Sequence, residues 1–375
     1  VAGSLPPALA EQGAETAVIL PLYRRVREKF ADQLTFLCYD YVDLAWRHTY
    51  CGLFSMKKDG VTWYFLDNEQ YFDRPELYGY VDDGERFGFF SRAVVKMLDH
   101  LEFWPDVIHC NDWQTALIPI YLKDDGVRED RYRSIRTVLT IHNIEYQGRY
   151  DPYCLGDLFG LDRGWVDDGT LLLDGDLNLL KGAILTADAV NAVSPTYAQE
   201  LKNPYFAHRM EGILTQCGYK LSGVLNGIDM KLYDPAADGR ITANYTAEDL
   251  SGKAADKTAL QNLMGLNEEP NTPIIAMVSR LVSHKGLDLL REIIRKERLI
   301  ELAFEGQRFW DMRRWKTAQQ HWSQATYGWD NLGSKAEAYY VRKEVYPGRS
   351  VSFKEYLWPL SLDDLLVNRN LEQTF

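Results

Sequence analysis

The sequence has no surplus of positive charge and few cysteines. Its 42 Lys and Arg residues against 54 Asp and Glu give a formal net charge of −12, so few cations are available to neutralise a phosphate backbone. This balance excludes general nucleic-acid binding, although a local cationic site for a small anion stays open. The five cysteines are scattered, with no C-x-x-C pair and no Cys/His cluster. We therefore expect neither a metal site nor a disulfide framework.

The chain also has no stretch of about 18 uninterrupted apolar residues, which a membrane-spanning helix needs. Its first residues carry no basic start before an apolar run, so they do not read as a secretory signal. We expect a reduced, cytoplasmic setting. No Walker loop, G-x-G-x-x-G fingerprint or Ser/His/Asp elbow is present, and we expect no cofactor. Nothing indicates a protein partner.

What the sequence does contain is a repeated strand–turn–helix pattern. Short apolar runs end in polar residues and lead into helical stretches, as in "ETAVILPLY", "PDVIHCNDWQTALIPIYL", "IRTVLTIHNIEYQG", "ADAVNAVSPTYAQEL" and "KLSGVLNGID". Strands that alternate with helices predict an α/β fold with a Rossmann-like, doubly wound parallel sheet. In such sheets ligands bind beyond the carboxyl ends of the strands.

The pattern changes along the chain and divides it into four parts. Residues 1–240 form the first Rossmann-like domain, and the polar stretch 241–271 reads as a surface helix with loops that crosses between domains. Residues 272–293 open a second domain with the strand "TPIIAMVSR" and one helix. Residues 294–375 form a mainly helical, irregular tail, in which "RKERLIELAFEGQRFWDMRRW" places Leu299 and Phe309 on one helical face.

Several polar residues fall at the predicted carboxyl end of a strand. Asp112 can bind sugar hydroxyls or cap the helix that follows it. His142 can donate to a substrate oxygen or be an ordinary satisfied polar residue, and Asn143 beside it can hydrogen-bond a polyol. Asp112 and Glu145 could also pair as the acid and nucleophile of a glycosidase, although the sequence does not fix their separation.

Three further residues lie in turns. Asn226, before Gly227, can accept from a hydroxyl or form a tight turn. Arg280 and Lys285 flank the turn that joins a strand to a helix in "SRLVSHKGLDLL". A helix N-terminus with two cations suits a diphosphate, but the same residues also fit a solvated basic turn.

The chain contains, in this order, the motifs "WRHTYCGLF", "YFDRPELYGYVDDGERFGFFSRAVVKML", "DVIHCNDWQTALIPIYLK", "TIHNIEYQGRY", "LKGAILTADAVNAVSPTYAQEL", "GVLNGID" and "VSRLVSHKGLDLL". This ordered set resembles bacterial glycogen (starch) synthases over about residues 1–292. This family consists of retaining glucosyltransferases of the GT-B fold, with two Rossmann-like domains that face a cleft. The resemblance implies transfer of glucose from ADP-glucose to the non-reducing end of an α-1,4-glucan, without a metal ion.

The resemblance also implies roles for residues. His142 matches an active-site histidine near the transferred glucose, and Arg280 and Lys285 match the cations that hold the donor diphosphate. The residues that match positions contacting substrate are Tyr80 in "LYGY", Asp112 in "NDW" and Asn226 in "LNGID".

Two departures from the family pattern set further expectations. The family's first strand and its K-x-G-G-L donor loop should lie just before Val1, so we expect a domain that lacks this strand. After about residue 293 the chain instead resembles the C-terminal part of SusD/RagB-type glycan-binding proteins, for which no glycan-binding residue is assigned. We therefore expect impaired or absent transfer, with a catalytically dead chimera or a SusD-like glycan-binding protein as the alternatives.

Overall fold

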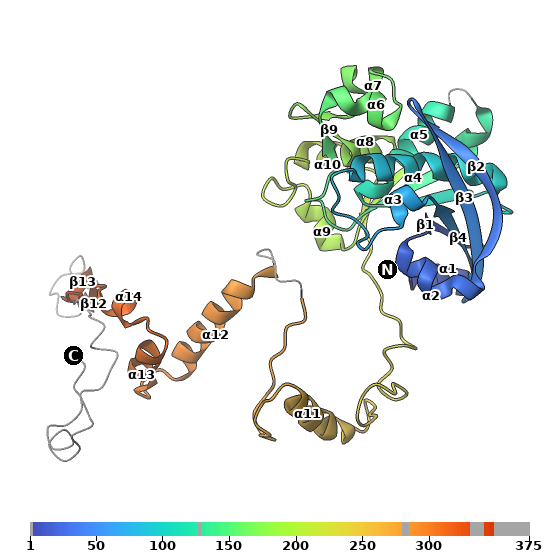
Figure 1. Ribbon diagram of the computed structural model, residues 1–375. Coiled ribbons are helices and arrows are strands. Elements are labelled where there is room, and N and C mark those ends of the chain that lie inside the picture. Colours follow the sequence, from blue (N-terminus) through green and yellow to red (C-terminus); the bar gives the residue numbers. More distant parts are fainter. Residues whose placement is uncertain (1–2, 127–128, 280–284, 331–340, 349–375) are drawn as a thin grey trace, which may run out of the picture. The chain divides into compact units, whose positions relative to one another are not determined.

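The computed structural model describes residues 3–126, 129–279, 285–330 and 341–348 (Figure 1). The chain divides into two compact units, Val1–Glu268 and Glu269–Phe375. Arg280, one of the predicted donor-binding cations, lies outside the described residues.

The first unit contains two four-stranded sheets. In the first sheet, with the order β1-β4-β3-β2, β1 pairs in parallel with β4, while β4, β3 and β2 form an antiparallel meander. The doubly wound prediction missed this hairpin, whose strands are long and alternate between buried and exposed residues. The strands are β1 (Ala17–Pro21), β2 (Thr35–Leu44), β3 (Arg47–Lys58) and β4 (Val61–Asp67).

The second sheet is fully parallel, as predicted, with the order β11-β10-β6-β5. Ser194 caps the helix that begins at Pro195: its Oγ accepts from Tyr197 N at 3.4 Å, and Pro195 occupies the first turn. The strands are β5 (Val107–Asn111), β6 (Arg136–Ile141), β10 (Ala189–Ala192) and β11 (Leu221–Gly223).

One continuous apolar core joins both sheets to the helices α3–α10, and it includes Phe72, Leu139, Phe159 and Ile184, which are all fully buried. Burial of such side chains contributes about 1.5–3 kcal/mol each. The helices are α1 (Leu5–Glu11), α2 (Arg24–Phe30), α3 (Glu69–Phe72), α4 (Asp83–Met97), α5 (Leu117–Gly126), α6 (Leu155–Phe159), α7 (Gly164–Asp167), α8 (Leu179–Thr186), α9 (Pro195–Glu200), α10 (Glu211–Gln216) and α11 (Gly252–Leu263).

Short elements complete this unit. A small antiparallel sheet has the order β7-β9-β8. Single turns of 3-10 helix connect the larger elements. These elements are β7 (Arg149–Tyr150), β8 (Leu172–Leu173), β9 (Asp176–Asn178), η1 (Ala31–Gln33), η2 (Leu98–His100), η3 (Trp113–Thr115), η4 (Asp130–Ser134) and η5 (Pro152–Cys154).

The second unit is mainly helical in its described residues. It contains α12 (Leu287–Glu301), α13 (Gln307–Arg314), α14 (Ala318–Trp322) and one antiparallel pair, β12 (Thr326–Asp330) with β13 (Val341–Tyr346). The long helix predicted from the tail is broken, because Phe304 and Gly306 adopt φ values of 68° and 74°. Its buried cluster is small, consisting of Met312 and Ala318 with Trp322 packed against them.

One predicted strand is wrong. Residues 273–278, the apolar part of "TPIIAMVSR", form no ladder. Their side chains are open to solvent, with Ile275 73% and Val278 99% exposed. Without a neighbouring strand the backbone amides of an extended segment have no partners, so apolar composition alone does not make a strand.

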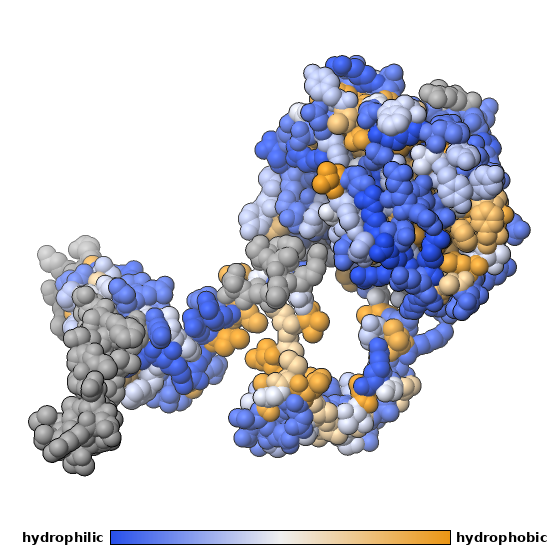
Figure 2. All heavy atoms as spheres, in the orientation of Figure 1, coloured by the Kyte–Doolittle hydropathy of each residue, from blue (hydrophilic) through white to orange (hydrophobic). Residues whose placement is uncertain are grey.

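The molecular surface in the view of Figure 2 is mostly hydrophilic, with apolar side chains in small groups. Among the described residues, no helix combines the length and the apolar composition needed to span a bilayer.

Candidate functional site

The predicted polar residues meet where two neighbouring strands of the parallel sheet end. Asp112 follows β5, and His142 and Asn143 follow β6. Asp112 has the backbone angles φ 54° and ψ −168°, a region that residues other than glycine rarely enter. Its N–H donates to Thr140 O at 3.0 Å, which ties the strained residue to the adjacent strand.

The Asp112 carboxylate organises the turn after β6. Oδ1 of Asp112 accepts from the backbone N–H of His142 at 2.7 Å and from that of Asn143 at 3.4 Å. Burial raises the pKa of the Asp112 carboxyl, although these hydrogen bonds oppose the shift. The side chain makes no capping bond to the following 3-10 turn, so the capping alternative is wrong. We name Asp112, His142 and Asn143 the strand-end corner.

The His142 ring is held by a residue that the sequence analysis missed. Nε2 of His142 lies 2.9 Å from Oδ1 of Asn111, the last residue of β5. Because an amide oxygen only accepts, this contact requires a proton on Nε2. The signal in the sequence was the place of Asn111, directly before Asp112 at a strand end.

The loop after His142 is anchored on both sides. The Tyr197 hydroxyl of α9 accepts from Ile144 N at 3.1 Å. Gly148 has φ +63°, and a Cβ on it would lie 2.7 Å from the Trp113 ring. Trp113 in turn lies edge-on to Phe87 of α4 at 5.3 Å between ring centroids. The strand-end corner therefore rests on closely packed, buried elements rather than on a free loop.

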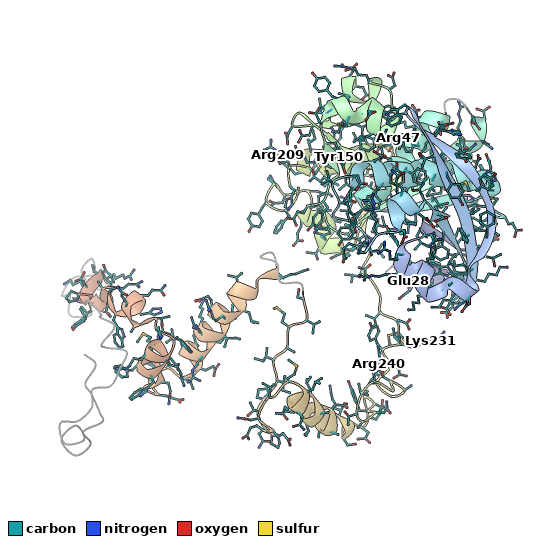
Figure 3. The ribbon with its side chains drawn as sticks, viewed as in Figure 1. Glu28, Arg47, Tyr150, Arg209, Lys231 and Arg240 are labelled. Carbon is teal, nitrogen blue, oxygen red and sulfur yellow. The ribbon has the colours of Figure 1, made fainter. Side chains whose placement is uncertain are left out.

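The aromatic packing around Trp113 extends to β7, which follows this loop. The ring of Tyr150, which Figure 3 labels, lies 6.3 Å from that of Trp113 and 5.5 Å from that of Phe159. A Cβ on Gly84 would lie 2.7 Å from the Tyr150 ring. Glycine at this position lets α4 approach β7 closely.

Tyr80 is fixed within its own loop. Its hydroxyl accepts from Glu76 N at 2.9 Å. The guanidinium groups of Arg74 and Arg86 each lie 4.9 Å from its ring centroid. Arg86 is fully buried and also donates to Tyr71 O at 2.7 Å. The loop before α4 is thus rigidly built around two cations that the sequence analysis did not single out.

The other described candidate residues are exposed. Asn226 is exposed in an irregular stretch after β11. Lys285 is exposed and belongs to the second unit. Glu145 is exposed, and its N–H donates to Asn143 Oδ1 at 3.0 Å. Because Oδ1 of Asp112 holds two backbone amides, the Asp112–Glu145 glycosidase pairing gains no geometric support.

No group of three or more His, Cys, Asp or Glu side chains within the described ranges is placed to hold a metal ion. The corner instead offers directed hydrogen-bonding groups on a rigid frame: the His142 ring and the side chain of Asn143. Such an arrangement suits a ligand rich in hydroxyl groups.

Comparison with known proteins identifies the family to which the first unit is similar. Residues 1–216 match the family model described as the starch synthase catalytic domain, which is more than half of the chain. The chain belongs to this family. The chain is 46% identical over 290 residues to the glycogen synthase of Lactobacillus acidophilus, which covers 77% of the chain and 61% of that protein. It is 44% identical over 302 residues to the glycogen synthase of Clostridium botulinum strain Alaska E43, covering 80% and 63%.

A solved structure supports the same starch synthase fold. The catalytic domain of starch synthase IV from Arabidopsis thaliana, bound to ADP and acarbose, is similar with a TM-score of 0.70 and 32% identity. The match covers 80% of this chain and 62% of that one. The chain thus spans about three fifths of the length of the curated relatives named above. Residues 264–375 match a second family model, the SusD family.

Proposed function

We propose that this protein carries the site of a glycogen (starch) synthase, which transfers glucose from ADP-glucose to the non-reducing end of an α-1,4-glucan with retention of configuration. The observation that carries the proposal is the strand-end corner, in which a strained Asp112 fixes the backbone of His142 and Asn143. Strain of this kind persists where surrounding structure over-determines it, and it is concentrated at functional sites. The family membership of residues 1–216 supplies the chemistry.

In this proposal one group of residues binds the sugar substrates and another binds the diphosphate of the donor. His142 lies beside the transferred glucose, with Asn143, Tyr80 and Asn226 as further contacts of the sugar substrates. Asp112 acts as a positioning residue, because its carboxylate is committed to backbone amides.

In the proposal, the two cations of the predicted phosphate turn, Lys285 and Arg280, bind the donor diphosphate. As the bond between glucose C1 and the diphosphate oxygen breaks, negative charge builds on the departing ADP. Fixed cations lower that barrier electrostatically, by about 3–4 kcal/mol for a well-placed donor. No metal ion or cofactor is part of the proposal.

We further propose that transfer by this chain is weak. Efficient transfer requires that both substrates be held in one geometry. In the described part of the second unit, helices α12–α14 and one antiparallel strand pair follow Lys285, rather than parallel strand–helix units. We propose that residues 1–240 form the catalytic domain, 241–271 the crossing, 272–293 the start of the second domain and 294–375 a SusD/RagB-like segment. We propose no separate function for that segment.

We also propose the substrates and the cellular compartment of the protein. The protein acts on a nucleotide sugar and an α-glucan, and we place it in the cytoplasm. All five cysteines are free, which suits a reducing compartment.

The test is incorporation of radiolabelled glucose from ADP-glucose into glycogen by the purified full chain. We expect a slow rate that falls by at least about 100-fold in His142→Ala, in line with the loss of a transition-state contact. The glycogen synthase of Lactobacillus acidophilus serves as the active reference. Equal rates for the chain and its His142→Ala variant would contradict the proposed site, and a rate equal to the reference would contradict impairment.

A further inference from the structure

The outer face of the β2–β3 hairpin carries a row of exposed aromatic rings that the strand-end corner does not use. The aromatic ladder, as we call it, consists of Tyr39 and Tyr41 on β2 with His48 and Tyr50 on β3. The alternation of the strands turns these side chains outward, while Val42, Leu44, Cys51 and Leu53 face the core. Tyr39 is 58% exposed and Tyr41 42%.

The rings of the ladder contact one another in sequence. Tyr41 stacks on His48 with 4.7 Å between ring centroids and 5° between planes. The Tyr39 ring lies 6.3 Å from that of Tyr41 and 5.8 Å from that of Tyr50. Asp43 holds the stack at one end, since its carboxylate lies 2.6 Å from Nδ1 of His48. The ladder is therefore a preformed surface and not a set of independent side chains.

A glycine makes room for the ladder. Gly52 pairs with Tyr39 across the two strands, and it is buried beneath Tyr50. A Cβ on Gly52 would lie 2.5 Å from the Tyr50 hydroxyl. With any other residue, Tyr50 would have to leave its place along the sheet.

A polar pocket adjoins the ladder and shares Tyr41 and Asp43 with it. The pocket has a volume of about 260 Å³. Within the pocket Arg92 pairs with Asp125, and Arg131 Nε donates to Glu129 at 2.7 Å, whereas Lys96 pairs with Asp40 outside the lining. The charged residues that line it are Asp43, Arg92, Lys96, Asp99, Asp125, Glu129 and Arg131.

We propose that the aromatic ladder and this pocket together bind an α-1,4-glucan chain at a second site. Aromatic faces cover the apolar faces of sugar rings, and paired side chains with spare hydrogen-bonding capacity suit hydroxyl groups. The pocket is lined by nearly equal numbers of cations and carboxylates, so its charge does not favour a strongly charged ligand. The choice of an α-glucan as the occupant rests on the proposed function.

This second site is distinct from the strand-end corner. Arg131 and Tyr132 of η4 line the pocket, and only Ile135 separates η4 from the first residue of β6. His142 follows the last residue of the same strand. Six strand residues separate the two places by about 20 Å. A chain held at the ladder would keep a long glucan attached while its end is used elsewhere, which raises its effective concentration.

The test is hydroxyl-radical footprinting of the full chain with and without maltoheptaose, in the absence of any sugar nucleotide. We expect maltoheptaose to reduce oxidation of Tyr39, Tyr41 and Tyr50. Tyr219, which is 85% exposed elsewhere in the same unit, is the internal control and should not change. Protection confined to other residues, or no protection, would overturn the proposal.

A variant gives a second readout. Tyr39→Ala combined with Tyr50→Ala should weaken the site-specific affinity for maltoheptaose by at least about tenfold, whereas Tyr219→Ala should leave it unchanged. An unchanged affinity at the ladder would overturn the proposal. Conversion of a dimer into a monomer by the double variant, seen by sedimentation velocity, would also overturn it by making the ladder a contact between copies. Because no donor is present, ladder-dependent binding would survive even if glucose transfer failed.

Discussion

The two units of this chain differ in how firmly they can hold a side chain. In the first unit a continuous apolar core ties both sheets to the surrounding helices. In the second, the described buried cluster is Met312 and Ala318 with Trp322 against them. There α12 leaves Ile293 55% exposed and Ile300 55% exposed. The strained Asp112 stands on the first kind of support.

This difference separates the two halves of the proposed chemistry. The groups for the sugar, His142 and Asn143, stand on buried strands of the first unit. The described cation for the diphosphate, Lys285, is exposed in the second. We infer that the sugar-binding half of the site is preorganised, whereas the phosphate-binding half has little support from its own unit.

The largest expected effect is on stability. Phe159→Ala removes a fully buried ring from the first core and should lower the free energy of unfolding of that unit by about 3–5 kcal/mol. Met312→Ala in the second unit should leave this transition unchanged, because its cluster belongs to other helices. Urea denaturation followed by far-UV circular dichroism measures both. Equal shifts for the two variants would mean that the units share one cooperative core.

A smaller effect is expected at the strand-end corner. Asp112→Ala removes the acceptor of the His142 and Asn143 amides and should cost about 1–3 kcal/mol. Asp112→Asn keeps an oxygen in the same place and should cost less. Hydrogen exchange of the His142 amide, measured by mass spectrometry with fragmentation, should accelerate in the alanine variant. Slow exchange in both variants would show that the carboxylate does not hold this turn.

The smallest effect concerns pH. Burial raises the pKa of Asp112, whereas the hydrogen bond from Arg209 lowers that of the exposed Asp174. Carboxyl carbon resonances should therefore titrate at a lower pH for Asp174, whose partner Arg209 Figure 3 labels, than for Asp112. The reverse order of titration would contradict the burial of the Asp112 carboxyl.

The same shift has a consequence for stability. Between the unfolded pKa of about 3.9 and the raised folded pKa, the folded state binds more protons at Asp112 than the unfolded state does. The free energy of unfolding should thus fall with rising pH across that window, relative to Asp112→Asn. Parallel pH profiles for the two proteins would contradict the shift.

The parallel sheet and the placement of the corner were predictable from the sequence. Apolar strands that end in "CND" and "IHN" put Asp112, His142 and Asn143 at one sheet edge before any coordinates are known. Ser194 as an N-cap followed from equally local rules. These features depend on short-range patterns, which a single sequence carries.

What the sequence could not give depends on tertiary contacts. The strain at Asp112 and the use of its carboxylate on the backbone of another strand have no local signature. The same holds for Asn111, whose role exists only because β5 and β6 are neighbours. The apolar run at 273–278 failed as a strand for the converse reason, since no strand among the described residues pairs with it.

The roles proposed for Tyr80, Asn226, Arg280 and Lys285 stay predictions. Tyr80 is held by its own loop, and Asn226 and Lys285 are exposed. In the second unit Trp310 is 53% exposed, while Trp315 stacks with Arg295 at 4.7 Å.

The most direct test of the account is an amide-resolved NMR titration of the full chain with ADP-glucose. We predict that the backbone amide signals of His142 and Asn143 shift as the sugar nucleotide is added, and that Asp112→Ala abolishes these shifts. Absence of any shift at saturating ADP-glucose, or identical shifts in the Asp112→Ala variant, would contradict a preorganised sugar site at this corner.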